Sequence, residues 1–148
     1  MTDASYAPGC DRSRSGTVIE VNGCLTHWAS NKQSITALSS CEAELNATLT
    51  GIKLANGIKA LVEELCNYMP VKLQLRGDNY ATLHSITKEV TSWRNRHYAV
   101  RAAGIRDLIK EEYIEVKHQK GTELSSDALT KVLEKTKLQE ARMRFQLQ

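Results

Sequence analysis

The stretch ALSSCEAELNATL, residues 37–49, joins a helix start to a series of small residues. Ser39 and Glu42 have the spacing of a capping box, in which the glutamate reaches back to the N–H of the serine. Two positions later comes Glu44, which is followed at helical spacing by small residues: Ala47, Thr48 and Gly51. The stretch therefore predicts a helix that packs closely against a sheet, with Glu44 overhanging the sheet edge.

The sequence around this helix predicts strands on both sides of it. Asn22-Gly23 lies between two β-rich runs in residues 17–31 and is a strong hairpin signal, with Trp28 expected in the core. Residues 71–77, VKLQLRG, alternate apolar with polar side chains, as a half-buried strand does. The further elements expected are a first strand around Asp3, helix 39–68 with a break plausible at Gly51 and Gly57, helices 78–86 and 94–112, strand 113–118, and a helix from Ser125 onward. This order predicts one α/β domain over residues 1–148 with a mixed sheet.

The composition is that of a folded globular protein. Of the 148 residues, 41% are hydrophobic and 25% are charged, and there are only two prolines. No apolar run has the length of a membrane span and no signal peptide opens the chain, so we expect an intracellular protein with no membrane partner. The net charge of +3 permits a polyanionic partner without requiring one. Four widely spaced cysteines argue against a zinc site and a disulfide scaffold: Cys10, Cys24, Cys41 and Cys66.

Four acidic residues fall where an α/β sheet places its ligands. Asp3 lies in the first strand, Asp78 follows the 71–77 strand, and Asp127 opens the last helix. With Glu44 they can all reach the carboxyl edge of the sheet, whereas Glu42 is occupied by capping. Each acid alone is also compatible with a plain role, as a mobile terminal acid, a turn residue or a helix-dipole partner. Four crowded carboxylates need cations, so the set predicts a Mg²⁺-dependent nuclease.

The motifs resemble a known family over nearly the whole chain. Five blocks occur in the family's order: TDASYAPGCDRSRSG (2–16), WASNKQSITALSSCEAEL (28–45), GDNYATL (77–83), RNRHYAVRAAGIRDLI (94–109) and IEVKHQKGTELSSDALTK (114–131). They are similar to the ribonuclease H domain of copia-type LTR retrotransposon polyproteins. The resemblance implies a ribonuclease H-like fold, a five-stranded mixed β-sheet flanked by α-helices.

The resemblance also implies an activity and a metal site. The family cleaves the RNA strand of RNA·DNA hybrids with two Mg²⁺ ions, for which Mn²⁺ can substitute, and leaves 5′-phosphate and 3′-hydroxyl ends. By motif, Asp3 would bridge both ions, Glu44 and Asp78 would complete one site, and Asp127 would help to hold the other. His118 resembles a loop histidine that assists proton transfer or product release, and a strand-end histidine with a packing role is the open alternative.

The resemblance places substrate contacts beside these acids. Ser39, Ser40 and Asn79 would face the minor groove and its 2′-hydroxyl groups, which distinguish RNA from DNA. Basic side chains would bind phosphates, although a solvated face explains them equally well: Arg12, Arg14, Arg96, His97 and Arg101.

The first strand departs from the family pattern, because the chain begins Met1-Thr2-Asp3 without the usual preceding apolar residues. We expect a truncated strand, an Asp3 exposed to fraying, and a fragment of a polyprotein with a reverse transcriptase upstream. The isolated domain is expected to be a monomer in the cytoplasm, or in a virus-like particle as part of the element. Two alternatives remain open: a remnant that binds hybrid without cleaving it, and another nuclease or integrase of the same fold.

Overall fold

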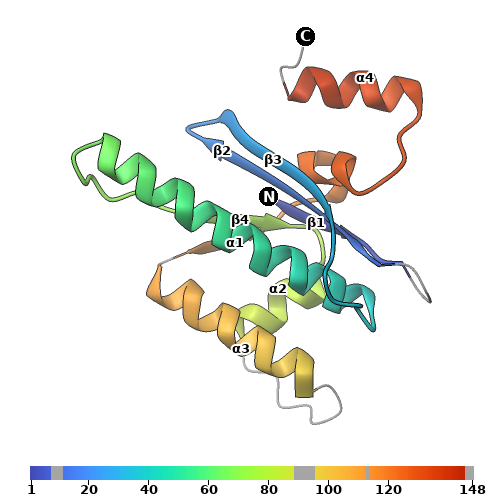
Figure 1. Ribbon diagram of the computed structural model, residues 1–148, viewed down its shortest axis with the longest axis horizontal. Coiled ribbons are helices and arrows are strands. Elements are labelled where there is room, and N and C mark those ends of the chain that lie inside the picture. Colours follow the sequence, from blue (N-terminus) through green and yellow to red (C-terminus); the bar gives the residue numbers. More distant parts are fainter. Residues whose placement is uncertain (8–11, 89–95, 113, 146–148) are drawn as a thin grey trace.

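The computed structural model describes residues 1–7, 12–88, 96–112 and 114–145 (Figure 1). For residues 96 and 97 it describes the backbone only. Three strands come first, and helices and single strands follow, which is the order that the sequence predicts. The strands are β1 Thr2–Ser5, β2 Arg14–Val21, β3 Cys24–Lys32, β4 Gln74–Gly77 and β5 Glu115–His118. The helices are α1 Ser40–Leu65, α2 Tyr80–Thr87, α3 Arg96–Glu111 and α4 Lys135–Arg144, with short 3-10 helices η2 Gly121–Glu123 and η3 Ser125–Leu129.

The strands form two hydrogen-bonded groups. β1, β2 and β3 pair antiparallel in that order, whereas β4 and β5 pair parallel. The two groups lie side by side, because the backbone oxygen of Thr2 in β1 lies against Gly77 in β4. The β2–β3 hairpin turns at Asn22 and Gly23, with φ of 52° and 81°. These left-handed values explain why Asn-Gly occupies the turn.

Helix α1 and helix η3 cover opposite faces of the β1–β2 pair. A Cβ added at Gly51 of α1 would overlap the side chain of Thr2, whereas one added at Gly16 of β2 would meet η3 at the backbone oxygen of Ser126, at 2.6 Å. Thr2 pairs with Thr17, one residue beyond Gly16, and successive residues of a strand point to opposite faces. Gly51 therefore lets α1 pack closely on one face of the strand pair, and Gly16 lets η3 pack closely on the other face.

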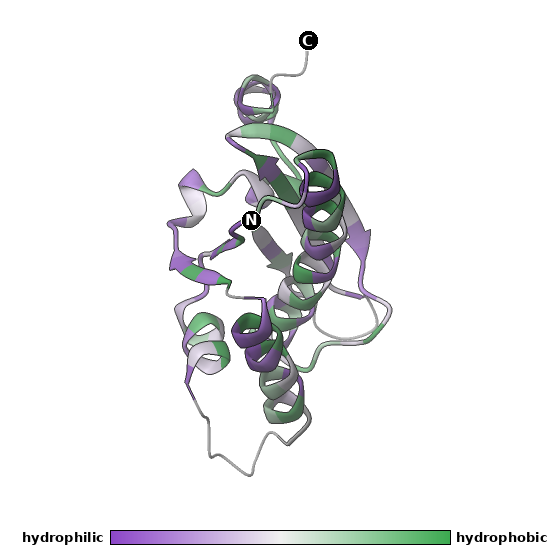
Figure 2. Ribbon diagram, turned by 90° about the vertical axis from the view of Figure 1, so that its left-hand side faces the viewer, coloured by the Kyte–Doolittle hydropathy of each residue, from purple (hydrophilic) through white to green (hydrophobic). Residues whose placement is uncertain are grey.

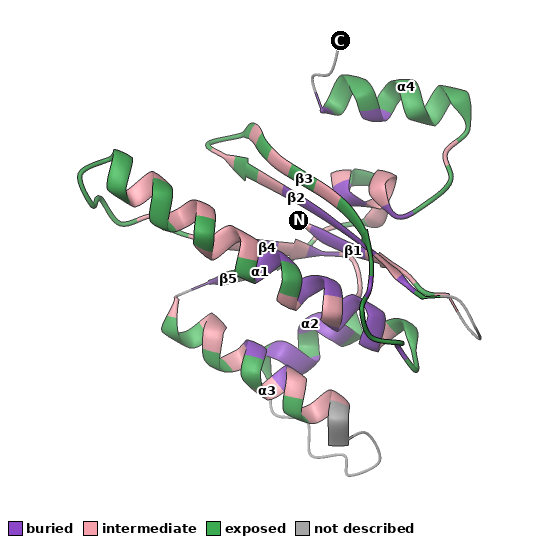
Figure 3. Cartoon of the chain, viewed as in Figure 1, coloured by how far each residue is buried: buried purple, intermediate pink, exposed green. Residues whose placement is uncertain are grey.

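The prediction that small residues let this helix pack closely on the sheet is confirmed at Gly51. Helix α1 runs unbroken through Gly51 and Gly57 over 26 residues. The expected division into two helices is therefore wrong. At Gly51 the lack of a side chain is needed for packing on β1, and at Gly57 nothing lies within 4 Å of an added Cβ. Burial is concentrated in the first half of α1, which lies on the sheet (Figure 3).

We expect opposite effects from alanine at these two glycines. Gly51→Ala should destabilise the fold by about 1–3 kcal/mol, because the new methyl group overpacks against Thr2. Gly57→Ala should stabilise it by about 0.5–1 kcal/mol, because alanine loses less backbone entropy in a helix. Urea denaturation of both variants measures the difference. Equal stabilisation by both substitutions would contradict the close packing of α1 on β1.

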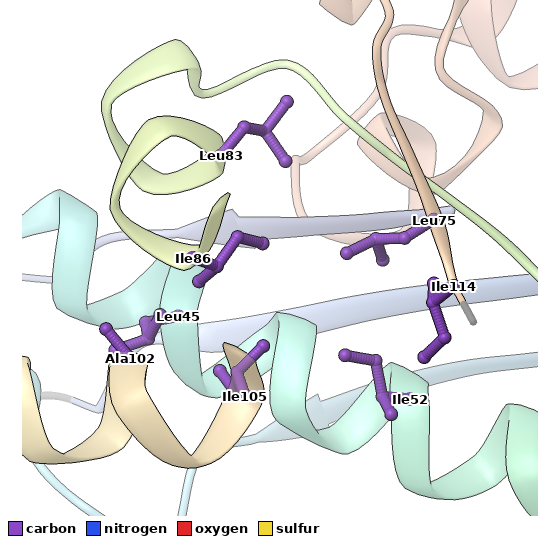
Figure 4. Packing of buried hydrophobic residues seen from close by; sticks show 8 residues of the cluster. All are labelled: Leu45, Ile52, Leu75, Leu83, Ile86, Ala102, Ile105 and Ile114. Carbon is purple, nitrogen blue, oxygen red and sulfur yellow. The ribbon is translucent and has the colours of Figure 1, made fainter. Parts of the chain in front are cut away.

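The main core lies between α1, the β4–β5 pair and the helices α2 and α3 (Figure 4). It is built from aliphatic side chains, and the exposed fraction of each is 8% or less. Its members are Leu45, Ile52, Leu75, Leu83, Ile86, Ala102, Ile105 and Ile114. These residues come from five elements or their flanks, so the core fixes the position of α1 against the end of β4, where acidic residues meet.

Two expectations about the periphery are wrong. The helix expected from Ser125 is divided into η3 and α4, with residues 130–134 outside any helix. The Thr130 hydroxyl, just after η3, lies 3.1 Å from the backbone oxygen of Asp127. Trp28 is 49% exposed on β3 instead of lying in the core, because none of the residues of β3 is buried.

Helix α4 lies beyond the sheet and is seen end-on in Figure 2. It packs through Ala141, with Phe145 just after its end, on Val18 of β2. Most of its other residues are exposed. Among the helices of the described residues, none combines the length and the apolar character that crossing a membrane requires.

Candidate active site

Three of the four predicted carboxylates converge on one point. Oxygen atoms of Asp3, Glu44 and Asp78 all lie within 4.8 Å of one another. Asp3 comes from the middle of β1, Glu44 from the start of α1, and Asp78 from the residue after β4. Residues up to 75 positions apart in the chain thus form one acidic cluster.

Asp3 is buried and is held by bonds on both sides of its strand. Its exposed fraction is 3%, its strand pairs it with Gly16, and the hydroxyl of Thr130 donates a hydrogen bond to its Oδ2. The amino group of Met1 donates to the backbone oxygen of Val18 at 2.7 Å and so anchors the strand ahead of Asp3. These bonds oppose the fraying expected at Asp3, because cross-strand bonds reach the first residue even though β1 is only four residues long.

Glu44 links the helix to the first strand. Its Oε1 accepts a hydrogen bond from the backbone N–H of Ala4 at 3.1 Å, and its exposed fraction is 8%. Burial, followed by the nearby charge of Asp3, raises the pKa of Glu44 to about 8. Burial is also the main cause that raises the pKa of Asp3, with Asp78 and Asp127 adding repulsion. The pocket therefore opposes three free negative charges and favours a bound cation.

Asp127 lies next to this cluster and is linked to it through Thr130. It is outside the group of three whose oxygen atoms lie within 4.8 Å of one another. The hydroxyl of Thr130 is within bonding distance of the Asp3 carboxylate and, at 3.1 Å, of the backbone oxygen of Asp127. The ammonium group of Lys131 forms an ion pair with the Asp127 carboxylate. Asp127 is thus a fourth acid whose charge acts on Asp3, and it carries a cation, Lys131, as its own partner.

The loop after β5 surrounds Asp78. A Cβ added at Gly121, the first residue of η2, would lie 2.8 Å from its Oδ2, so any larger residue there would require the carboxylate to move. The Nε2 atom of His118 lies 3.0 Å from the backbone oxygen of Asp78. The His118 ring packs edge-on against Tyr80, with centroids 6.2 Å apart. His118 is exposed beside the cluster, where both a catalytic and a packing role remain available to it.

The start of α1 confirms the separation of the two glutamates. The Ser39 hydroxyl accepts a hydrogen bond from the N–H of Glu42 at 3.1 Å. The Glu42 carboxylate accepts one from the N–H of Leu38 at 2.8 Å, one residue before the expected serine. Its second oxygen accepts from the Arg101 guanidinium at 2.8 Å. Glu42 is therefore a structural residue, and Arg101 is one of its partners.

The other predicted substrate residues lie at or near the ends of elements. Asn79 caps α2 by accepting a hydrogen bond from the N–H of Thr82 at 3.0 Å, and Ser40 is exposed at the start of α1. In β2, the Arg14 guanidinium donates to Ser30 of β3 at 3.2 Å. The residue Arg12 is exposed just before β2. The side chains of Arg96 and His97, at the start of α3, lie outside the described part of the chain. Their roles in substrate binding remain predictions.

Thr130 and Lys131 are site residues that the sequence argument did not identify. The signal was available, because they follow Asp127 by three and four positions and helical spacing places such residues on one face.

Comparison with solved structures identifies the fold. The structure of LC11-RNase H1, isolated from compost by a metagenomic approach, matches with a TM-score of 0.64 and 16% identity, covering 86% of this chain and 88% of that one. The crystal structure of LC11-RNase H1 in complex with an RNA/DNA hybrid matches with a TM-score of 0.63 and 14% identity, covering 86% and 89%. The domain therefore has the ribonuclease H-like fold.

Comparison of sequences gives the narrower group, although no family model matches the chain. The Ty1-DR5 Gag-Pol polyprotein of Saccharomyces cerevisiae (strain ATCC 204508 / S288c) is 30% identical over 135 residues, and the Ty1-NL2 Gag-Pol polyprotein of the same strain is 32% identical over 136. Each match covers 90% of this chain and 8% of the polyprotein. The chain belongs with the ribonuclease H domains of copia-type retrotransposon polyproteins.

Proposed function

We propose that the domain is an endonuclease that hydrolyses the RNA strand of RNA·DNA hybrids. The observation that carries the proposal is the convergence of Asp3, Glu44 and Asp78 within 4.8 Å at the edge of a ribonuclease H-like sheet. That one of the similar structures holds an RNA/DNA hybrid supports this choice of substrate. Since the relatives are Gag-Pol polyproteins, we further infer that the domain works with a reverse transcriptase of the same polyprotein.

The carboxylates fit hard divalent cations. All three offer oxygen atoms, and burial together with the nearby charge of Asp3 raises the pKa of Glu44 to about 8, so a bound cation would relieve the cost of charging the cluster. Asp3, Glu44 and Asp78 would hold one Mg²⁺ or Mn²⁺ ion, and Asp127 would join Asp3 in holding a second. Such a pair supplies Lewis-acid stabilisation of the attacking and leaving oxygens of a phosphodiester, which yields 5′-phosphate and 3′-hydroxyl ends.

The protein's own groups orient this site. The Thr130 hydroxyl fixes one oxygen of Asp3, and the Ala4 N–H fixes one oxygen of Glu44, so each keeps its other oxygen available. Gly121 leaves room for the Asp78 carboxylate. His118, exposed at the rim, is positioned to take up or release a proton as product leaves. Ser39, Ser40 and Asn79 lie at the starts of α1 and α2, near the acids, where 2′-hydroxyl groups would be read.

A cleavage assay on the purified chain tests this function. We expect cutting of a hybrid with labelled RNA in Mg²⁺, no cutting in EDTA, and much weaker cutting of duplex DNA. Asp78→Asn should remove the activity because it takes a charged ligand from the cluster. Binding of hybrid without cleavage by the wild type would favour a non-cleaving remnant. Equal cutting of duplex DNA and hybrid would favour another nuclease of this fold.

A further inference from the structure

Lys131 is a cation beside the carboxylates. Its Nζ atom forms an ion pair with Asp127 Oδ1, four residues earlier. Its charge also acts on the other three acids, since it opposes the rise in pKa of Asp3 and Glu44, and Asp78 in turn acts on Lys131. The side chain is 58% exposed, so the ammonium group can leave the carboxylate for water.

The neighbouring residues set the direction of this side chain. Thr130, which is 6% exposed, is bonded to Asp3, and this bond fixes the backbone just before Lys131. Gly16 allows this turn to lie against β2, because a Cβ there would lie 2.8 Å from the methyl group of Thr130. The turn that carries Lys131 is therefore attached to the strand that carries Asp3.

We propose that Lys131 is a built-in counter-cation that competes with the metal for Asp127. This inference rests on the proposed function, since it assigns a role to the metal pocket. A divalent ion that uses the Asp127 carboxylate must displace the ammonium group and then tolerate its positive charge nearby. Lys131 therefore stabilises the metal-free cluster and weakens metal binding. The metal site is therefore expected to bind its ion with moderate affinity and to exchange that ion readily.

Metal titration without nucleic acid measures the effect directly. Isothermal titration calorimetry with Mn²⁺ and with Mg²⁺ should show tighter binding to Lys131→Met than to the wild type, by about three- to tenfold, from loss of one partly exposed ion pair and one repulsion. Lys131→Gln should behave like Lys131→Met, and Lys131→Arg should bind like the wild type. Lys135→Met, at the exposed start of α4, is the control for net charge and should bind like the wild type.

The outcomes separate this inference from the proposed function. Tighter binding in both neutral variants and not in Lys135→Met supports the competition. Equal or weaker binding in Lys131→Met and Lys131→Gln overturns it while the metal-dependent function survives. Absence of binding in the wild type and in every variant overturns the proposed metal site itself. Because the Lys131 side chain is 58% exposed, we expect both neutral variants to fold, and a circular dichroism melt verifies this.

Discussion

Asp3→Asn is expected to reduce hybrid cleavage by about 10²- to 10⁴-fold, a loss of several kcal/mol of transition-state stabilisation. Asp3 is the acid that contacts both sides of the site, being within 4.8 Å of Glu44 and Asp78 and bonded through Thr130 to the turn of Asp127. Asparagine keeps the shape and can still accept the Thr130 hydrogen bond. The loss therefore isolates the charge of the carboxylate, measured as initial rates on labelled hybrid.

The matched control is Asp107→Asn, which removes the same charge from an exposed position on α3 and should leave the rate unchanged. Stability gives a second readout. In EDTA at pH 8 the Asp3→Asn chain should be as stable as the wild type or more stable, because the substitution removes the Asp3 charge that repels Glu44. An inactive but destabilised Asp3→Asn chain would point to misfolding, and an active one would remove Asp3 from the proposed site.

Glu44→Gln is expected to change how stability depends on pH. Burial raises the pKa of Glu44 from 4.5 to about 8, so the folded chain binds more protons than the unfolded chain between these values. Stability of the metal-free wild type therefore falls as pH rises across this window. Glutamine stays neutral and can still accept from the Ala4 N–H, so it removes this loss. Relative to the wild type, Glu44→Gln should gain roughly 2–4 kcal/mol between pH 5 and pH 8, at about 1.4 kcal/mol per pKa unit.

Urea denaturation in EDTA at several pH values measures this gain. Comparison between variants matters, because burial lowers the pKa of the Met1 amino group to about 6, which gives an opposite slope between that value and pH 8.0 in every variant. Glu64→Gln, at an exposed position of the same helix, should show no pH-dependent difference. Parallel pH profiles of wild type and Glu44→Gln would show that Glu44 ionises normally.

Features that depend only on residues close together in the sequence were predicted correctly. The hairpin at Asn22-Gly23, the cap at Ser39 and the small residues before Gly51 are confirmed because turn, cap and packing depend on neighbouring residues. Trp28 is the counterexample. Alternation indicates that a strand has two faces, but it does not tell how fully a helix covers each face, and β3 is poorly covered.

The sequence by itself determined most of the strands and helices, the positions of Glu44 and Asp78 at element ends, and the assignment of Glu42 to capping. These properties follow from hydrogen bonds and side-chain periodicity within one or two turns. Only the tertiary structure decided that Asp3 is anchored, that Asp127 lies apart from the other three acids, and that Thr130 and Lys131 reach them. Those features depend on contacts across more than a hundred residues, where close backbone packing at Gly16 and Gly51, and not local preference, fixes distances between charges.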